Sequence, residues 1–207
     1  MLKPLKKNIN YKNNSEILLI IKSQSKYTQL LNSSIGVNQH IKYVNGTIKF
    51  AKSLSDDLLK YLLVRLHARK LGCNEDFIWK KNFPKVRNNY GKKNIFDLYN
   101  KSRIVVHSYA VTGYLETLAM NIPTIIFHDL KNSPFTYEAT KDLSDLIECK
   151  IFHHNPETAA SHLNEVYINI DKWWLSEEVQ SARKEFVKKY CKINENKLNA
   201  VKDILKN

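Results

Sequence analysis

Four short runs of apolar, often β-branched residues recur along the chain. They cover residues 16–24 (EILLIIKSQ), 61–67 (YLLVRLH), 103–108 (RIVVHS) and 123–128 (PTIIFH). A continuous apolar run, without alternation of polar residues, is typical of a strand that is covered on both faces. The pattern therefore predicts a parallel sheet.

The segments between these runs have helical patterns. Residues 41–60 are only partly regular, whereas residues 94–102 (NIFDLYNKS) place Asn94 as an N-cap with Asp97 at the third helical position. Strands that alternate with helices imply right-handed crossovers. We therefore expect an α/β fold with a Rossmann-like parallel sheet and helices on both of its faces.

The C-terminal third has helical patterns only. One helix is predicted to start at Asn155 and Pro156, and a second at Ser176. A last helix is expected over residues 196–205. The apolar stripe predicted for the second helix consists of Val179, Ala182, Phe186 and Tyr190.

These patterns divide the chain into three parts. Residues 1–14 are expected to be a flexible basic tail, and residues 15–175 a Rossmann-like domain. Residues 176–207 are expected to form C-terminal helices that pack either on this domain or on a partner.

The net charge leaves two interpretations open. The 207 residues include 33 Lys and Arg against 20 Asp and Glu, a net charge of +13. This favours phosphate-rich ligands, nucleic acid or an anionic membrane surface as partners. A chain rich in Lys, Asn and Ile through AT-rich coding would carry the same charge without any such partner. Nucleic acid is not expected, because the basic residues are dispersed and no nucleic-acid-binding motif is present.

Other motifs that would define a compartment or a cofactor are missing. Cys73, Cys149 and Cys191 are scattered, so the sequence predicts neither disulfides nor zinc, and a cytoplasmic location is expected. The apolar residues 17–21 are too few for a signal or a membrane span, which leaves peripheral attachment to a membrane open. Without a G-x-G-x-x-G, Walker A, D-x-D or H-E-x-x-H motif, we expect no bound cofactor and no metal.

The turn between residues 107 and 113 is the main candidate site. His107 and Ser108 end a predicted parallel strand, and the next helix would start near Thr112 or Gly113. Ligands of open parallel sheets bind at this edge, where helix N-termini attract phosphate. Gly113 would leave room for an anion, and Glu116 could accept hydrogen bonds from the two hydroxyls of a ribose.

Each of these residues also has a structural interpretation. Glu116 could stabilise the helix dipole, as the N3 residue of a cap if Gly113 is the N-cap. His107 could be a buried histidine at the end of a strand, and Thr112 could be only a cap. The residues alone leave both interpretations open.

Four ordered segments carry a family resemblance. They are residues 64–67 (VRLH), 89–103 (NYGKKNIFDLYNKSR), 103–129 (RIVVHSYAVTGYLETLAMNIPTIIFHD) and 173–186 (WWLSEEVQSARKEF). The third segment resembles the donor-binding segment of GT-B glycosyltransferases. Together the four resemble a transferase family first described in Leptospira surface-polysaccharide loci. This resemblance implies that Glu116 binds the ribose of a nucleotide donor, with Ser108, Thr112 and Gly113 at its phosphates. Arg65 or His107 would support the donor by charge or hydrogen bonding.

A more distant resemblance is to teichoic-acid-type glycerophosphotransferases, in which a strand ending in a basic residue and His-Pro meets phosphate. Arg65 and His67 stand at such a strand end, but Ala68 replaces the proline. These two residues are either phosphate contacts or a solvent-facing pair. His128 and Asp129 follow the next strand and are candidates to meet the sugar or the acceptor.

The resemblance implies one half of a GT-B fold, the half that binds the donor. The expected function is the donor-binding domain of a glycosyl- or glycerophospho-transferase in surface polysaccharide or lipopolysaccharide synthesis. Its ligand would be a nucleotide diphosphate donor such as a nucleotide sugar or a CDP-linked group, and a separate N-terminal acceptor domain or chain would complete it. The alternative is a non-catalytic remnant or subunit that docks a partner chain.

Overall fold

The computed structural model describes residues 15–25, 36–69, 71–131 and 135–191. Within these ranges, six strands form one parallel sheet in the order β3-β2-β1-β4-β5-β6. This is the order of a doubly wound Rossmann-like sheet, and the predicted fold class is confirmed. The strands are β1 (Glu16–Ile20), β2 (Leu62–Arg65), β3 (Arg87–Asn89), β4 (Ser102–His107), β5 (Thr124–Phe127) and β6 (Phe152–His153).

The helices start largely where the sequence predicts them. The side chains of Asn94, Asn155 and Ser176 each accept a hydrogen bond from a backbone N–H of the first turn, so these three N-caps are confirmed. The helices are α1 (Val37–Lys52), α2 (Asp56–Leu59), α3 (Glu75–Asn82), α4 (Ile95–Lys101), α5 (Thr112–Ala119), α6 (Tyr137–Lys141), α7 (Ser144–Glu148), α8 (Pro156–Val166), α9 (Ile170–Trp174) and α10 (Glu177–Tyr190).

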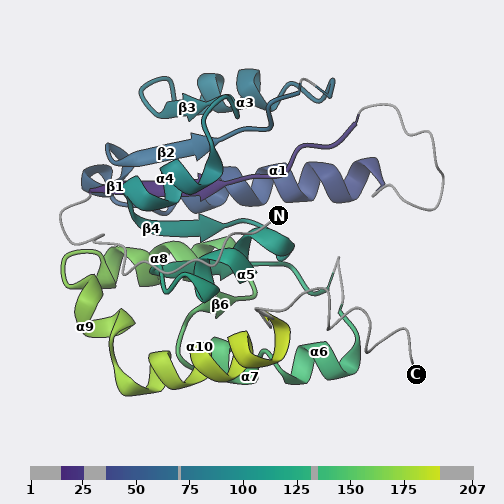
Figure 1. Cartoon of the computed structure of the whole chain (residues 1–207). Coiled ribbons are helices and arrows are strands. Elements are labelled where there is room, and N and C mark those ends of the chain that lie inside the picture. Colours follow the sequence, from purple (N-terminus) through teal and green to yellow (C-terminus); the bar gives the residue numbers. More distant parts are fainter. Residues whose placement is uncertain (1–14, 26–35, 70, 132–134, 192–207) are drawn as a thin grey trace.

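Helices cover both faces of the sheet (Figure 1). On one face α1 packs against α8, and the ring of Phe50 from α1 stacks on that of Phe127 from β5 with centroids 5.1 Å apart. On the other face Leu98 and Tyr99 of α4 pack with Leu18 and Val105. Because successive side chains of a strand point to opposite faces, neighbouring residues at a strand end serve different sides of the sheet.

The helix α10 packs on α5 (Figure 1). The Arg183 guanidinium donates to the Leu118 carbonyl at 2.8 Å, which satisfies a carbonyl at the end of α5. The rings of Phe186 and Tyr114 lie 6.2 Å apart across the same contact. The C-terminal helices, as far as Tyr190, are thus joined to the sheet domain. The expected basic tail and the expected helix over residues 196–205 lie outside the described residues.

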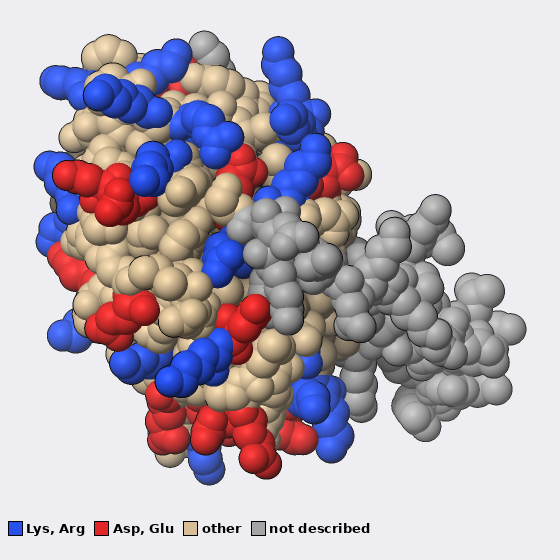
Figure 2. Space-filling view, turned by 90° about the vertical axis from the view of Figure 1, so that its left-hand side faces the viewer, with Lys and Arg blue, Asp and Glu red and all other residues tan. Residues whose placement is uncertain are grey.

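Charged side chains of both signs are interspersed on the face of the molecule shown in Figure 2. This view is from the left of Figure 1, the side on which the strands begin. In the described ranges, no helix is both long and apolar enough to cross a membrane.

Candidate functional site

A pocket of about 450 Å³ lies at the carboxyl edge of the sheet, next to the point where the strand order reverses between β1 and β4. It is bounded by the residues that follow β1, β4, β5 and β6, with α1 and the start of α8 as walls. Ligands of doubly wound sheets bind in such a crevice, since the loops on its two sides diverge there.

A hydrogen-bonded chain fixes the floor of this pocket. The Ser108 hydroxyl donates to the Ile20 carbonyl at 2.9 Å, and the Tyr43 hydroxyl lies 2.7 Å from the Ser108 oxygen. The Lys22 backbone N–H donates to the Tyr43 hydroxyl at 2.7 Å. With its proton used for Ile20, the Ser108 hydroxyl accepts from Tyr43. Ser108, which was predicted to bind phosphate, therefore has a structural role. Its hydroxyl links β4, which it follows, to β1 through Ile20 and to α1 through Tyr43.

The pocket is lined by three lysines, Lys22, Lys42 and Lys49, and by two carboxylates, Asp129 and Glu157. The Lys22 ammonium lies 4.9 Å from the centroid of the Tyr43 ring, and burial lowers its pKa. Lys49 pairs with Glu157 at 3.3 Å. The start of α8 directs the positive end of its dipole toward the same pocket, although Pro156 has no N–H and the Thr158 N–H is capped by Asn155. Sequence reasoning identified Asn155 as a helix cap but did not connect it to this site.

His128 lies at the same pocket and is 9% exposed. Its ring stacks on that of Phe135 with centroids 5.0 Å apart, and its backbone N–H donates to the His153 carbonyl. The prediction that His128 follows a strand at the ligand edge agrees with this location.

A second group of polar residues surrounds Glu116 on the α4 and α5 side of the sheet. The Tyr99 hydroxyl donates to the Glu116 carboxylate at 3.3 Å. Burial raises the pKa of Glu116, and the Tyr99 hydrogen bond opposes that rise. Burial also raises the pKa of Tyr109, and the nearby positive charge of Arg65 opposes this rise. Tyr109 also lines the pocket, so it is shared by the pocket and by this second group.

Arg65 is held in this second group by two hydrogen bonds. Its guanidinium donates to the Asn89 side chain at 3.0 Å and to the Lys93 carbonyl at 3.1 Å. His67, by contrast, is exposed and accepts a hydrogen bond from the Arg69 N–H at 3.1 Å. It lines a separate pocket of about 470 Å³. The structure therefore separates Arg65 from His67, although they are two residues apart.

The start of α5 differs from the expected cap. The helix begins at Thr112 with Val111 as N-cap, so Glu116 is the fifth helical residue and not the N3 residue of a cap at Gly113. Thr112 is exposed and provides no cap. A Cβ atom at Gly113 would lie 3.1 Å from the His107 ring and 3.4 Å from the Tyr99 hydroxyl. Gly113 thus permits close packing with these two side chains and does not leave open space for an anion.

His107 is a buried histidine at the end of a strand, 1% exposed. Its Nε2 atom lies 3.1 Å from the Thr117 hydroxyl, and burial lowers its pKa to about 3. A neutral, enclosed ring cannot provide charge to a phosphate. Of the two interpretations that the sequence left open for His107, the structure supports the structural one.

Acid is expected to destabilise the protein through its buried histidines. Burial lowers the pKa of His107 to about 3, of His153 to about 4 and of His162 to about 3. The unfolded chain takes up these protons first, at its ordinary pKa of about 6.5. The free energy of unfolding should therefore decrease as pH falls below about 6.5, by up to about 1.4 kcal/mol per pH unit for each histidine, until the folded pKa values are reached.

Urea unfolding of His162→Leu tests this expectation. Neither ring nitrogen of His162 has a hydrogen-bond partner among the described residues, so the substitution removes a titrating group without breaking a bond. We expect a shallower loss of stability than in the wild type between about pH 6.5 and 4.5. The exposed His154→Gln serves as the control and should leave the slope unchanged. Equal slopes for all three proteins would contradict the assignment.

The sheet order and the pocket beside the reversal of that order define a Rossmann-like α/β protein with a pocket at the carboxyl edge of its sheet. The sequence profile of the LIC12162 family transferase matches residues 1–205, and the chain belongs to this family. It is therefore a member of a transferase family. Among curated proteins, none matches the chain significantly.

Proposed function

We propose that this transferase binds a nucleotide-linked donor across the carboxyl edge of its sheet, for glycosyl or glycerophospho transfer in surface polysaccharide synthesis. The observation that carries the proposal is the pocket beside β1 and β4. Lys22, Lys42 and the start of α8 bring positive charge to it, while Lys49 is paired with Glu157 and Asp129 also lines it. A nucleotide diphosphate is the anion that this combination of charge and location suits best.

In this proposal the donor extends from the pocket to Glu116. The diphosphate lies near Lys22 and Lys42, and Tyr109 lies between it and the nucleoside. The Glu116 carboxylate accepts hydrogen bonds from the ribose hydroxyls, as the resemblance to GT-B enzymes suggests. Tyr99 orients that carboxylate through its own hydrogen bond at 3.3 Å. Arg65 adds positive charge on the Glu116 side.

These residues contribute to transfer by position and charge. When the bond to the transferred group breaks, negative charge develops on the departing diphosphate. Fixed ammonium groups and the positive end of the α8 dipole stabilise that charge without reorganising. His128, stacked on Phe135 at the pocket, is the candidate contact for the transferred group or the acceptor.

We further propose that a second unit presents the acceptor, as in the two-domain GT-B enzymes that the sequence resembles. The purified chain alone is then expected to bind donor but to transfer nothing. A radiolabelled nucleotide sugar, incubated with the chain and separated from its products, tests this directly. Turnover of the donor without any added partner would contradict the second-unit proposal while leaving donor binding intact.

Calorimetric titration with UDP, GDP, CDP, CMP and their sugar or alcohol conjugates tests donor binding. One of them should bind saturably, and Glu116→Ala should weaken that binding by about 1 to 3 kcal/mol, the usual loss when a partly buried hydrogen-bonding group is removed. Glu148→Ala is the matched control, because Glu148 is an exposed carboxylate at the end of α7.

The outcomes of this titration separate the alternatives. Equal binding by wild type and Glu116→Ala would contradict the ribose assignment. Absence of binding to every nucleotide would contradict the donor proposal and favour a non-catalytic subunit that docks a partner chain.

A further inference from the structure

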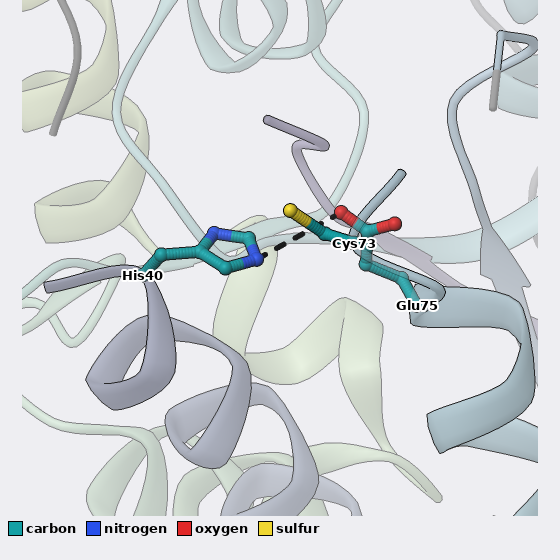
Figure 3. Close-up of side chains that lie close together, drawn as sticks. All are labelled: His40, Cys73 and Glu75. Carbon is teal, nitrogen blue, oxygen red and sulfur yellow. Dashed lines mark ion pairs between the residues drawn. The ribbon is translucent and has the colours of Figure 1, made fainter. Parts of the chain in front are cut away.

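Three side chains that can bind a metal ion lie close together, and they come from two segments that are distant in the sequence. His40 belongs to α1, Cys73 to the loop before α3, and Glu75 is the first residue of α3 (Figure 3). One potential ligand atom from each lies within 4.8 Å of the others. The His40 Nε2 atom is 4.0 Å from a Glu75 carboxylate oxygen, and the three groups face one another.

We propose that His40, Cys73 and Glu75 form a binding site for a divalent metal ion, with Zn²⁺ as the ion that their chemistry favours. Zinc is commonly bound by thiolate and imidazole ligands together, and a carboxylate is its usual oxygen ligand. Magnesium and calcium, which require oxygen ligands, are disfavoured by this set.

The distances are close to those of a bound site. Metal bonds of about 2.0 to 2.3 Å place tetrahedral ligand atoms roughly 3.3 to 3.8 Å apart. The cluster, whose ligand atoms lie within 4.8 Å of one another, therefore has to contract by about 1.5 Å at most. Cys73 lies between Gly72 (φ 94°) and Asn74 (φ 51°), two left-handed residues that turn the loop sharply on both sides of the thiol.

The surroundings of Glu75 support the binding of a cation. Glu75 is only 8% exposed, and a buried carboxylate requires compensation by hydrogen bonds or positive charge. The Ser23 hydroxyl donates to its Oε1 atom at 2.6 Å, which orients the carboxylate as outer partners of metal ligands do. His40 is held by packing beside Tyr43, with ring centroids 6.4 Å apart.

Three protein ligands leave a fourth tetrahedral position open. Zinc sites of this type hold water or a substrate atom there, whereas structural sites use four protein ligands. Glu75 also lines the second pocket, together with Arg69 and Lys80. A metal held by Glu75 would therefore lie at the wall of a pocket that carries positive charge and would add to its affinity for an anionic group.

Zinc titration of the full chain, stripped with a chelator and kept reduced, tests the proposal. We expect one equivalent of Zn²⁺ to bind, and one equivalent of Co²⁺ to give the visible absorption and thiolate charge-transfer bands of a tetrahedral site. We expect each of the variants His40→Gln, Cys73→Ser and Glu75→Gln to lower the zinc affinity at least about tenfold. Substitution of a residue that only hydrogen-bonds to a metal ligand already lowers metal affinity by about that factor. Cys149→Ser is the control and should bind as the wild type does.

A readout on the unmodified chain guards against variants that fail to fold. In the wild type, Zn²⁺ should slow alkylation of Cys73 but not of Cys149 or Cys191, as followed by peptide mass spectrometry. Zinc binding without protection of Cys73, or protection of all three cysteines alike, would overturn the proposal. So would a stoichiometry below one equivalent in folded protein.

Discussion

Replacing Trp174 by alanine is expected to lower the free energy of unfolding by about 3 to 5 kcal/mol, the range for removal of a buried tryptophan. Trp174 ends α9 and is 0% exposed. Its indole N–H donates to the Asn121 carbonyl at 3.3 Å, next to the end of α5. The substitution therefore leaves a large cavity and an unpaired carbonyl where the C-terminal helices meet the sheet domain.

Urea unfolding measured by fluorescence and circular dichroism gives this difference. The neighbouring Leu175→Ala is the control, since Leu175 is 49% exposed and its loss should change stability by no more than about 0.5 kcal/mol. If Trp174→Ala cost no more than Leu175→Ala, the C-terminal helices would not belong to the cooperative core.

Gly91→Ala is expected to destabilise the protein by about 2 to 4 kcal/mol. Gly91 has φ +70°, and a Cβ atom there would lie 2.7 Å from the backbone nitrogen of Ala68. The added methyl group would combine left-handed strain with a backbone clash. The Gly91 N–H also donates to the Asn89 side chain, which accepts from Arg65, so the support of Arg65 would be lost as well.

Gly46→Ala provides a control of opposite sign. Gly46 lies within α1, and its nearest neighbour would be Pro156 at 3.9 Å, an ordinary contact. Alanine should stabilise this helix by about 0.5 to 1 kcal/mol, because glycine is the more flexible residue in the unfolded chain. Thermal unfolding of both variants measures the contrast. Similar changes at the two positions would contradict the backbone conformation described for Gly91.

The fold could be predicted from the sequence where burial leaves a strong pattern. The strands β1, β2, β4 and β5 are the four apolar runs, since each is covered by helices on both faces. The strands β3 and β6 were not predicted, because both lie at the edges of the sheet and are three and two residues long. Edge strands of this length carry no apolar run, and only pairing with a neighbour defines them.

The site was predictable only in its general location. That ligands bind beyond the strand ends follows from the fold, and Ser108, His128 and Glu116 lie near that edge. At the end of β4, the alternation of side chains turns His107 toward Thr117 and the next residue, Ser108, toward Tyr43 on the other face. The lysines of the pocket were not identified, because Lys22 follows β1 whereas Lys42 and Lys49 lie in α1, and only the fold brings these two segments to the same edge of the sheet.

The candidate metal cluster gives no signal in the sequence. His40, Cys73 and Glu75 come from two separate segments, and local ligand spacings describe only sites built from one or two short motifs. The loop turns at Gly72 and Asn74 bring the segments together, and such turns depend on the tertiary structure.

Amide chemical-shift mapping of the isotopically labelled chain tests the central claim most directly. During titration with whichever of UDP, GDP, CDP or CMP binds by calorimetry, the largest changes should occur at Lys22, Tyr43, Tyr109 and the start of α8, with smaller changes at Glu116. That result would place the donor at the pocket beside β1 and β4. Changes confined to the second pocket, around Arg69 and Lys80, would contradict the proposed donor site.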